Sequence, residues 1–170
     1  QEEGFSDSIA LQRVAVNGWT TQNLQSGIAS AQPDSNFNVV TILIGVNNQY
    51  QRRSLSQYRK ELKQLLNQSM VFAQGQPERV LAISIPDWSV TPAGAGQRER
   101  VGAEIDAFNA VKKELCDSLG IDYINITTLS RTGLNDPKLV ASDGLHFSAQ
   151  MHLLWRRELF AKWKQKILLP

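Results

Sequence analysis

The residues with the clearest chemical potential lie near the C-terminal end of the chain, in Ser142-Asp143-Gly144-Leu145-His146. Asp143 and His146 are three residues apart on a turn that contains glycine, so their side chains can converge on one small site. A carboxylate that accepts a hydrogen bond from one histidine ring nitrogen leaves the other nitrogen free as a general base. The alternative is an ordinary surface turn, capped by Ser148 at the start of the last helix. The pentapeptide by itself leaves both interpretations open.

Two stretches upstream carry groups that suit the same chemistry. Asn47 follows a run of β-branched residues and Gly45, and its side-chain amide can donate a hydrogen bond to a developing oxyanion. Gly18 can present its backbone N–H to the same point. Asparagine at the exit of a strand is also common turn chemistry. The occurrence of both groups together with Asp143 and His146 favours the catalytic interpretation.

The elements that must position these groups alternate along the chain. Strands are predicted over 11–16, 39–44, 79–85 and 121–126. Helices are predicted over about 21–31, from Ser54 or Ser56 to about Ala73, over about 98–118 and over about 148–167, with loop between Thr127 and Ser142. The run at 39–44 is continuous and β-branched, which is typical of a strand buried on both faces. Alternating strands and helices predict a parallel sheet with helices on both faces.

In sheets of this kind, ligands gather at the carboxyl ends of the strands. Gly18, Asn47, Asp87 and the Asp143–His146 turn all come just after predicted strands or in late loops, so we expect their polar groups to face one common edge. Three aromatic residues also follow strand ends and either line the site or belong to the core: Trp19, Tyr50 and Trp88.

Composition narrows the class of protein. With 170 residues, 42% hydrophobic and 20% charged, the chain suits one globular domain over 1–170. A net charge of +2 with no long basic run gives no indication of nucleic-acid binding. No apolar run is long enough to span a membrane, and the compartment is left open. The lone Cys116 is predicted to be a small buried residue, and one Cys with two His disfavours a zinc site. We expect no metal and no cofactor.

Three stretches resemble sequence blocks of a known family: Asn17-Gly18-Trp19-Thr20-Thr21, Ile44-Gly45-Val46-Asn47-Asn48-Gln49-Tyr50 and Asp143-Gly144-Leu145-His146. They resemble blocks two, three and five of the SGNH (GDSL-type) hydrolases, in the right order. Asn48 stands where many members have Asp. The resemblance implies a three-layer α/β/α sandwich with a parallel, flavodoxin-like sheet. It also implies cleavage of esters, thioesters or carbohydrate acetyl groups without a metal.

By this resemblance, His146 would be the general base and Asp143 the carboxylate that orients it. Gly18, through its N–H, and Asn47, through its side chain, would be the oxyanion donors. The expected activity is a serine-type hydrolase acting on a small-molecule carboxylic ester through an acyl-enzyme. Its oligomeric state is open.

The chain departs from the family in its first block, an apolar strand followed by Gly-Asp-Ser. No such strand precedes any serine here, and the nearest local match, Ser6-Asp7-Ser8, lies only ten residues before Gly18. In the family this strand lies inside the sheet, between the segments corresponding to 11–16 and 39–44. Loss of this interior strand would leave unpaired backbone groups and an open core, and the chain begins at Gln1 rather than Met. We therefore expect either that an upstream segment supplies the first strand and the nucleophile or that another segment replaces them, and we interpret the match at Ser8 as a coincidence.

Two rival functions remain. If no serine is supplied, the chain would be a catalytically inactive module that binds an acyl or carbohydrate ligand on the same scaffold. A flavodoxin-like nucleotide binder is weaker, because no Gly-rich phosphate loop or Walker-type lysine follows the first predicted strand.

Overall fold

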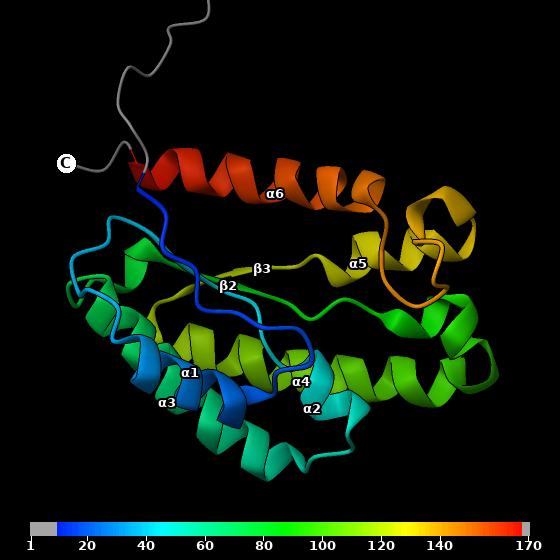
Figure 1. Ribbon diagram of the computed structural model, residues 1–170, viewed down its shortest axis with the longest axis horizontal. Coiled ribbons are helices and arrows are strands. Elements are labelled where there is room, and N and C mark those ends of the chain that lie inside the picture. Colours follow the sequence, from blue (N-terminus) through cyan, green and yellow to red (C-terminus); the bar gives the residue numbers. More distant parts are fainter. Residues whose placement is uncertain (1–9, 168–170) are drawn as a thin grey trace, which may run out of the picture.

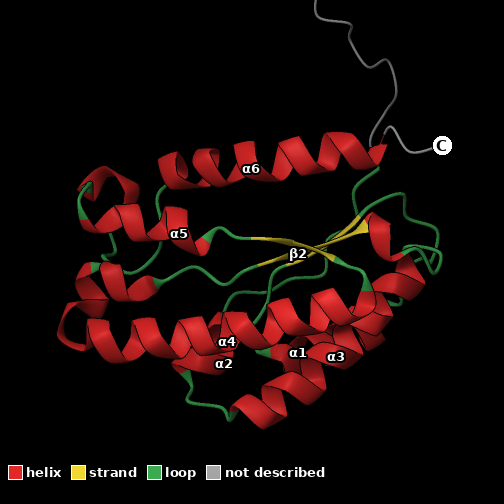
Figure 2. Cartoon of the chain, turned by 180° about the vertical axis from the view of Figure 1, so that it is seen from behind, coloured by secondary structure: helices red, strands yellow, loops and turns green. Residues whose placement is uncertain are grey.

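The computed structural model describes residues 10–167, which form an α/β fold around a parallel sheet. Helix α6 (Ala149–Ile167) lies on one side of the sheet, and α1 (Thr21–Ala31), α3 (Leu55–Phe72) and α4 (Arg98–Leu119) lie on the other (Figures 1 and 2). This is the predicted arrangement of a parallel sheet between two helical layers, so the predicted fold class is confirmed.

The sheet contains three described strands in the order β1 (Val40–Ile42), β2 (Val80–Ile83) and β3 (Asp122–Ile124). All three run parallel, with Val40 opposite Val80 and Leu81 opposite Asp122. Every residue of β2 is buried, as expected of a central strand covered on both faces. Three of the four predicted strands are therefore confirmed, each shorter than the apolar run that predicted it.

The strand predicted over 11–16 is wrong. Residues 10–16 are not assigned to any strand, and both Leu11 and Val16 are exposed, Leu11 to 88%. Only Val14 packs partly against the core. An alternating pattern shows that a segment can pair, but the pairing itself depends on a neighbouring strand that is distant in sequence. No strand of the described chain hydrogen-bonds to the edge of β1 that faces away from β2.

The predicted helices are confirmed, and their boundaries follow from their caps. Thr20 precedes α1 in a capping box with Asn23, and the Ser54 side chain accepts a hydrogen bond from the backbone of Gln57 at the start of α3. Helix α4 ends at Gly120, whose φ of 70° is readily adopted only by glycine.

Short helical segments occupy stretches without helical periodicity. Helix α2 (Val46–Tyr50) follows β1 directly, and the expected loop over 127–142 contains α5 (Thr127–Ser130) and two 3₁₀ turns. The loop expectation for 127–142 is therefore corrected. Helices of one turn are too short to show an amphipathic period.

Two hydrophobic clusters cover the two faces of the sheet. One lies among the sheet, α3 and α4 and includes Tyr58, Leu62, Ile105 and Cys116, so the predicted burial of Cys116 is confirmed. The other lies under α6 and includes Met151 and Trp155. Among the helices of residues 10–167, none is long and apolar enough to cross a bilayer.

Candidate active site

The Asp143–His146 turn forms a compact hydrogen-bonded unit. The Oδ2 atom of Asp143 lies 2.6 Å from Nδ1 of His146, so a proton on Nδ1 is donated to the carboxylate. The other oxygen, Oδ1, accepts hydrogen bonds of 2.9 Å from the backbone N–H groups of Leu145 and His146. Gly144 adopts a φ of 71° between them, which lets the turn close tightly. This arrangement directs the second nitrogen of His146, Nε2, away from the carboxylate.

The same contacts determine the charge of Asp143. The backbone N–H of Leu145, the His146 ring and the backbone N–H of His146 together lower the pKa of Asp143 to about 2. The carboxylate is therefore ionised at any pH well above 2. The two side chains are 52% and 61% exposed for Asp143 and His146, so both are accessible to a ligand.

Backbone hydrogen bonds and core packing hold the Asp143–His146 turn in place. The backbone N–H of Ala93 donates to Gly144 O at 2.9 Å, and that of Ala141 donates to His146 O at 2.8 Å. Phe147, the next residue, is buried and packs edge-on against Trp155 with ring centres 5.2 Å apart. The turn is thus held from two sides by residues outside it.

The structure also brings the other two candidate residues together. The side-chain Nδ2 of Asn47 donates to Trp19 O at 3.2 Å, which places Asn47 beside the Gly18-Trp19 turn. Gly18 has a φ of 83° and is exposed, with no atom near the position of a Cβ. Within the described chain, the Gly18 N–H and the second amide hydrogen of Asn47 make no hydrogen bond. Two donors are therefore available next to each other.

Gly45 explains how the chain places Asn47 so close to the strand end. It is buried, caps the N-terminus of α2 and has a φ of 121°. A Cβ at this position would lie 2.8 Å from the Tyr58 ring, so any larger residue would displace either the turn or the core. Asn47 is the second residue of α2 and follows β1 with only four residues between them.

A group of residues lies between the segments that follow β1 and β2 and the Asp143–His146 turn. Trp88 is buried and its Nε1 donates to Gln49 Oε1 at 2.7 Å, while Tyr50 stacks edge-on against it at 5.2 Å. Trp88, Tyr50 and Ala93 line a common hollow, and Ala93 holds Gly144. Trp19 instead lies against Gly27 of α1. Tyr50 and Trp88 thus line this hollow, Trp88 also belongs to the hydrophobic core, and Trp19 packs on α1.

Asp87 does not belong with the exposed groups expected at this edge. Its side chain is only 3% exposed, and its Oδ2 forms a 2.8 Å ion pair with Arg131. Its Oδ1 accepts a hydrogen bond from the backbone of Ser89. These contacts make Asp87 a buried anchor for the loop after β2, and the expectation that it faces the site is corrected.

The remaining component of a triad is a nucleophile. No serine hydroxyl in residues 10–167 forms a hydrogen bond with His146, and Ser8 lies outside the described residues. No cluster of three metal-ligating side chains occurs in the described part of the chain.

Two positioning residues were not predicted from the sequence. Lys112 is fully buried and donates to Ile44 O and Ile83 O at 2.9 and 2.7 Å. Asn48 binds both the backbone and the hydroxyl of Thr21. No sequence pattern marks these contacts, because each joins segments that are distant along the chain.

Comparisons with solved structures identify proteins of similar fold. The chain is similar in fold to the acetylxylan esterase Axe2 from Geobacillus stearothermophilus, with a TM-score of 0.65, 17% identity and coverage of 86% of this chain and 68% of Axe2. The lipase/acylhydrolase from Enterococcus faecalis gives a TM-score of 0.63 and 20% identity, over 90% of this chain and 73% of that one.

A third structure, the α/β hydrolase LAE5 from the metagenome of Lake Arreo, Spain, gives a TM-score of 0.64 and 18% identity, over 86% and 69% of the two chains. No protein of curated function matches this chain in sequence. The sequence model of the GDSL-like Lipase/Acylhydrolase family matches residues 3–154. The chain therefore belongs to the GDSL-like lipase/acylhydrolase family.

Proposed function

We propose that this protein hydrolyses carboxylic esters with His146 as general base and Asp143 as the carboxylate that orients it. The observation that carries the proposal is the exposed pair itself, with Nδ1 of His146 2.6 Å from Oδ2 of Asp143. A histidine held in this way presents Nε2 as a proton acceptor. The available donors of Gly18 and Asn47 are the groups that would stabilise the oxyanion.

The reaction proceeds in two stages. A serine hydroxyl transfers its proton to Nε2 of His146 and attacks the ester carbonyl, and the tetrahedral oxyanion accepts hydrogen bonds from Gly18 N–H and the Asn47 amide. The intermediate expels the alcohol, which takes the proton from His146 and leaves an acyl-enzyme. Water, deprotonated by His146, then attacks the acyl group, releases the acid and restores the serine.

The serine is the component to be identified by experiment. We propose either Ser8 or a serine from a segment outside these 170 residues as the nucleophile. A fluorophosphonate probe labels an activated serine covalently, and mass mapping of the labelled peptide identifies it. Label on Ser8, or on a peptide outside this sequence, supports the hydrolase. Intact protein that takes up no label would favour the alternative, an inactive scaffold that binds an acyl or carbohydrate ligand.

Replacing His146 tests the general base. We expect His146→Ala to lower kcat/KM for a short-chain ester by about 10²–10⁴-fold, the usual contribution of general acid–base catalysis. The side chain is exposed, so the midpoint of thermal unfolding should change little.

The chain offers a matched control in its only other histidine. His152 is exposed and its ring stacks on Trp155 at 4.8 Å. Among the described residues, the Asp143 side chain is hydrogen-bonded to Leu145 and His146 and not to His152. His152→Ala should retain wild-type kcat/KM. Wild-type turnover by His146→Ala, or an equal loss in both variants, would refute the assignment of His146.

A further inference from the structure

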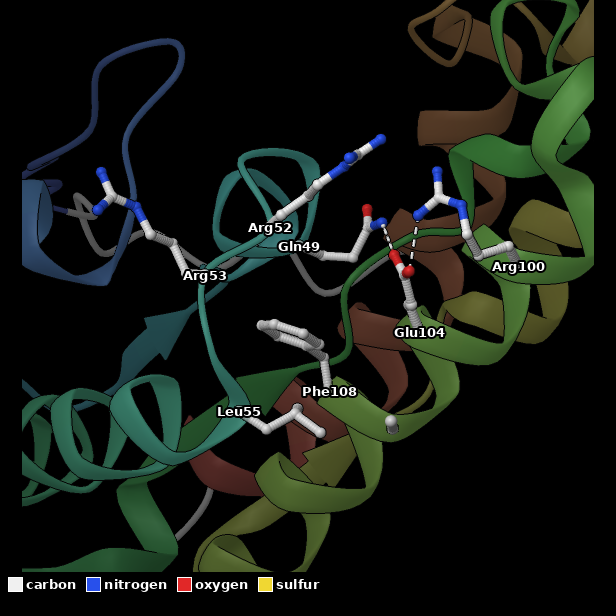
Figure 3. A pocket seen from close by; sticks show the side chains of 8 residues that line it. Gln49, Arg52, Arg53, Leu55, Arg100, Glu104 and Phe108 are labelled. Carbon is white, nitrogen blue, oxygen red and sulfur yellow. Dashed lines mark hydrogen bonds and ion pairs between the residues drawn. The ribbon is translucent and has the colours of Figure 1, made fainter.

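A cavity of about 400 Å³ lies between the end of α2 and the N-terminal half of α4 (Figure 3). Its lining includes four charged residues, Arg52, Arg53, Arg100 and Glu104, and the apolar residues Phe108 and Leu55. A second hollow of about 290 Å³ shares Arg52 and Arg100 with it and extends to Ala93. The backbone N–H of Ala93 donates to Gly144 O at 2.9 Å, so this second hollow borders a residue that is hydrogen-bonded to the Asp143–His146 turn.

The residues that line the cavity carry more positive than negative charge. Glu104 is the only carboxylate among the described residues that line the cavity, against three arginines. One Glu104 oxygen accepts from Arg100 at 2.6 Å and the other from Gln49 at 2.7 Å. Burial raises the pKa of Glu104, but the hydrogen bonds from Gln49 and Arg100 outweigh it and the pKa is lowered. The charge of Arg52 also contributes to lowering the pKa of Glu104. With Glu104 ionised, the three arginines leave a net charge of +2 around the cavity.

Arg52 is the guanidinium of this cavity that has no hydrogen-bonding partner in the described chain. Arg53 donates to Gln51 Oε1 at 3.3 Å, and it points away from Arg100 (Figure 3). Arg52 instead extends toward the side of the cavity where Arg100 lies. Within residues 10–167, its side chain forms no hydrogen bond and no ion pair within 4 Å. A guanidinium presents a planar fork of donors that fits a carboxylate.

Arg52 has a backbone conformation that glycine adopts more easily than arginine. Its φ is 56°, and it closes α2 with hydrogen bonds of 2.9 Å from Arg52 N to Gln49 O and 2.8 Å from Arg53 N to Asn48 O. This pattern is a Schellman motif, in which the left-handed residue is usually glycine. Gln32 and Gln74 adopt the same left-handed conformation near the ends of α1 and α3, so the conformation alone does not mark Arg52 as functional. The motif also ties Arg52 rigidly to α2, the helix that carries Asn47.

We propose that Arg52, assisted by Arg100, binds a carboxylate carried by the ester substrate, so that the enzyme selects esters with a second, anionic group. This inference rests on the proposed ester hydrolysis. The aromatic side chains of Trp88 and Tyr50 line the hollow that also contains Arg52, Arg100 and Ala93, and they would contact the carbon skeleton between the two ends of the substrate.

Pairs of esters that differ only in charge test the selectivity. Methyl hydrogen glutarate and methyl glutaramate place a carboxylate or an amide on the acyl side, and 4-acetoxybenzoate and 4-acetoxybenzamide place it on the alcohol side. We expect kcat/KM to favour the anionic member by about tenfold or more in at least one pair, as for a hydrogen bond to a charged group. The preference should decrease as salt is raised.

Arg52→Gly removes the charge and suits the left-handed backbone, so the variant should fold with an unchanged or higher midpoint of thermal unfolding. We expect it to lose the preference for the anionic ester while kcat/KM for the neutral ester stays the same. The matched control is Arg157→Gln on α6, an exposed residue whose loss changes the net charge equally. The control should retain the preference. Equal rates within both wild-type pairs, a preference that survives in Arg52→Gly, or an equal loss in the control would overturn the inference.

A binding measurement separates this inference from the proposed function. Calorimetric titration with glutarate against uncharged glutaramide, and with 4-hydroxybenzoate against 4-hydroxybenzamide, detects anion binding without turnover. Protein that hydrolyses no ester but binds the anions through Arg52 would retain the anion site and refute the hydrolase. Protein that hydrolyses neutral esters but shows neither anion preference nor anion binding would retain the hydrolase and refute the anion site. Neither turnover nor anion binding would refute both.

Discussion

At the scale of single residues, Asp143 shows how an exposed turn can hold a defined charge. Three hydrogen bonds, from two backbone N–H groups and one ring nitrogen, converge on its two oxygens. Because these contacts lower its pKa to about 2, protonation of Asp143 should not limit activity until the pH approaches 2. Any loss of activity at mildly acidic pH would therefore originate in another group.

Asn47 offers the second prediction at this scale. If its amide donates to the oxyanion, Asn47→Ala should lower kcat by about 10²–10³-fold, with a small effect on KM, because that hydrogen bond is strongest in the transition state. Single-turnover and steady-state rates with a short-chain ester measure the effect.

Asn135→Ala is the control, since Asn135 is exposed and follows a 3₁₀ turn. The Asn47 side chain also donates to Trp19 O, so thermal unfolding must be measured in parallel. An unchanged kcat in Asn47→Ala would show that Asn47 is not an oxyanion donor and has only a structural role in the turn.

At the scale of elements, α1, α2 and α3 are joined by one chain of hydrogen bonds. The Asn48 Oδ1 accepts from Thr21 N at 3.0 Å, and its Nδ2 donates to the Thr21 hydroxyl at 2.6 Å. That hydroxyl donates its own proton to the carboxylate of Glu61 in α3. The group facing the hydroxyl must therefore be a donor, which explains an amide at position 48, where many SGNH-type sequences have a carboxylate.

This direction of donation predicts the effect of Asn48→Asp. The new carboxylate would face the oxygen of a hydroxyl already committed to Glu61, so we expect the free energy of unfolding to fall by about 1–3 kcal/mol. Urea unfolding at neutral pH measures the loss.

Glu61→Gln in the same protein provides the matched rescue. Its amide could donate to the Thr21 hydroxyl, whose proton would then turn to the new carboxylate at position 48, so the double variant should be more stable than additivity predicts. Strictly additive losses would contradict the proposed direction of donation.

At the scale of the whole molecule, Lys112 ties α4 to the edge of the sheet where the candidate site lies. Its Nζ donates to carbonyls at or just beyond the ends of β2 and β1, those of Ile83 and Ile44. Complete burial lowers the pKa of Lys112 to about 7. A neutral amine still has two N–H donors, one for each of these two carbonyls. Both hydrogen bonds of Lys112 can therefore persist when it loses its charge.

The lowered pKa predicts how stability depends on pH. In the unfolded chain Lys112 holds its proton up to about pH 10.5, so above pH 7 the unfolded state binds more protons than the folded state. The free energy of unfolding should rise from pH 7 to 9, by at most about 1.4 kcal/mol per pH unit. Urea unfolding across this range measures the slope.

The range ends at pH 9 because burial raises the pKa of Cys116 to about 11, which makes stability fall at higher pH. Lys112→Met keeps the apolar stem and removes the titrating group, so its stability should show a smaller slope between pH 7 and 9. The same slope in both proteins would show that Lys112 is not the group responsible.

The sequence by itself determined the features that depend on local spacing. Periodic apolar residues predicted the four long helices and the buried strands around 39–44, 79–85 and 121–126. The interval between Asp143 and His146 indicated a contact that the structure shows at 2.6 Å. Such features need only a few neighbouring residues, and the backbone geometry between those residues is set by local sterics.

Only the tertiary structure decided which distant segments meet. The segment 11–16 has the alternation of a strand yet pairs with none of the described strands, because pairing requires a partner far away in sequence. The partners of Lys112 lie 29 and 68 residues away, and Asp87 is buried by Arg131, 44 residues later. Arg52 faces a cavity only because α2 and α4 pack together. Buried polar groups must find partners wherever the fold places them, and no local pattern in the sequence records that placement.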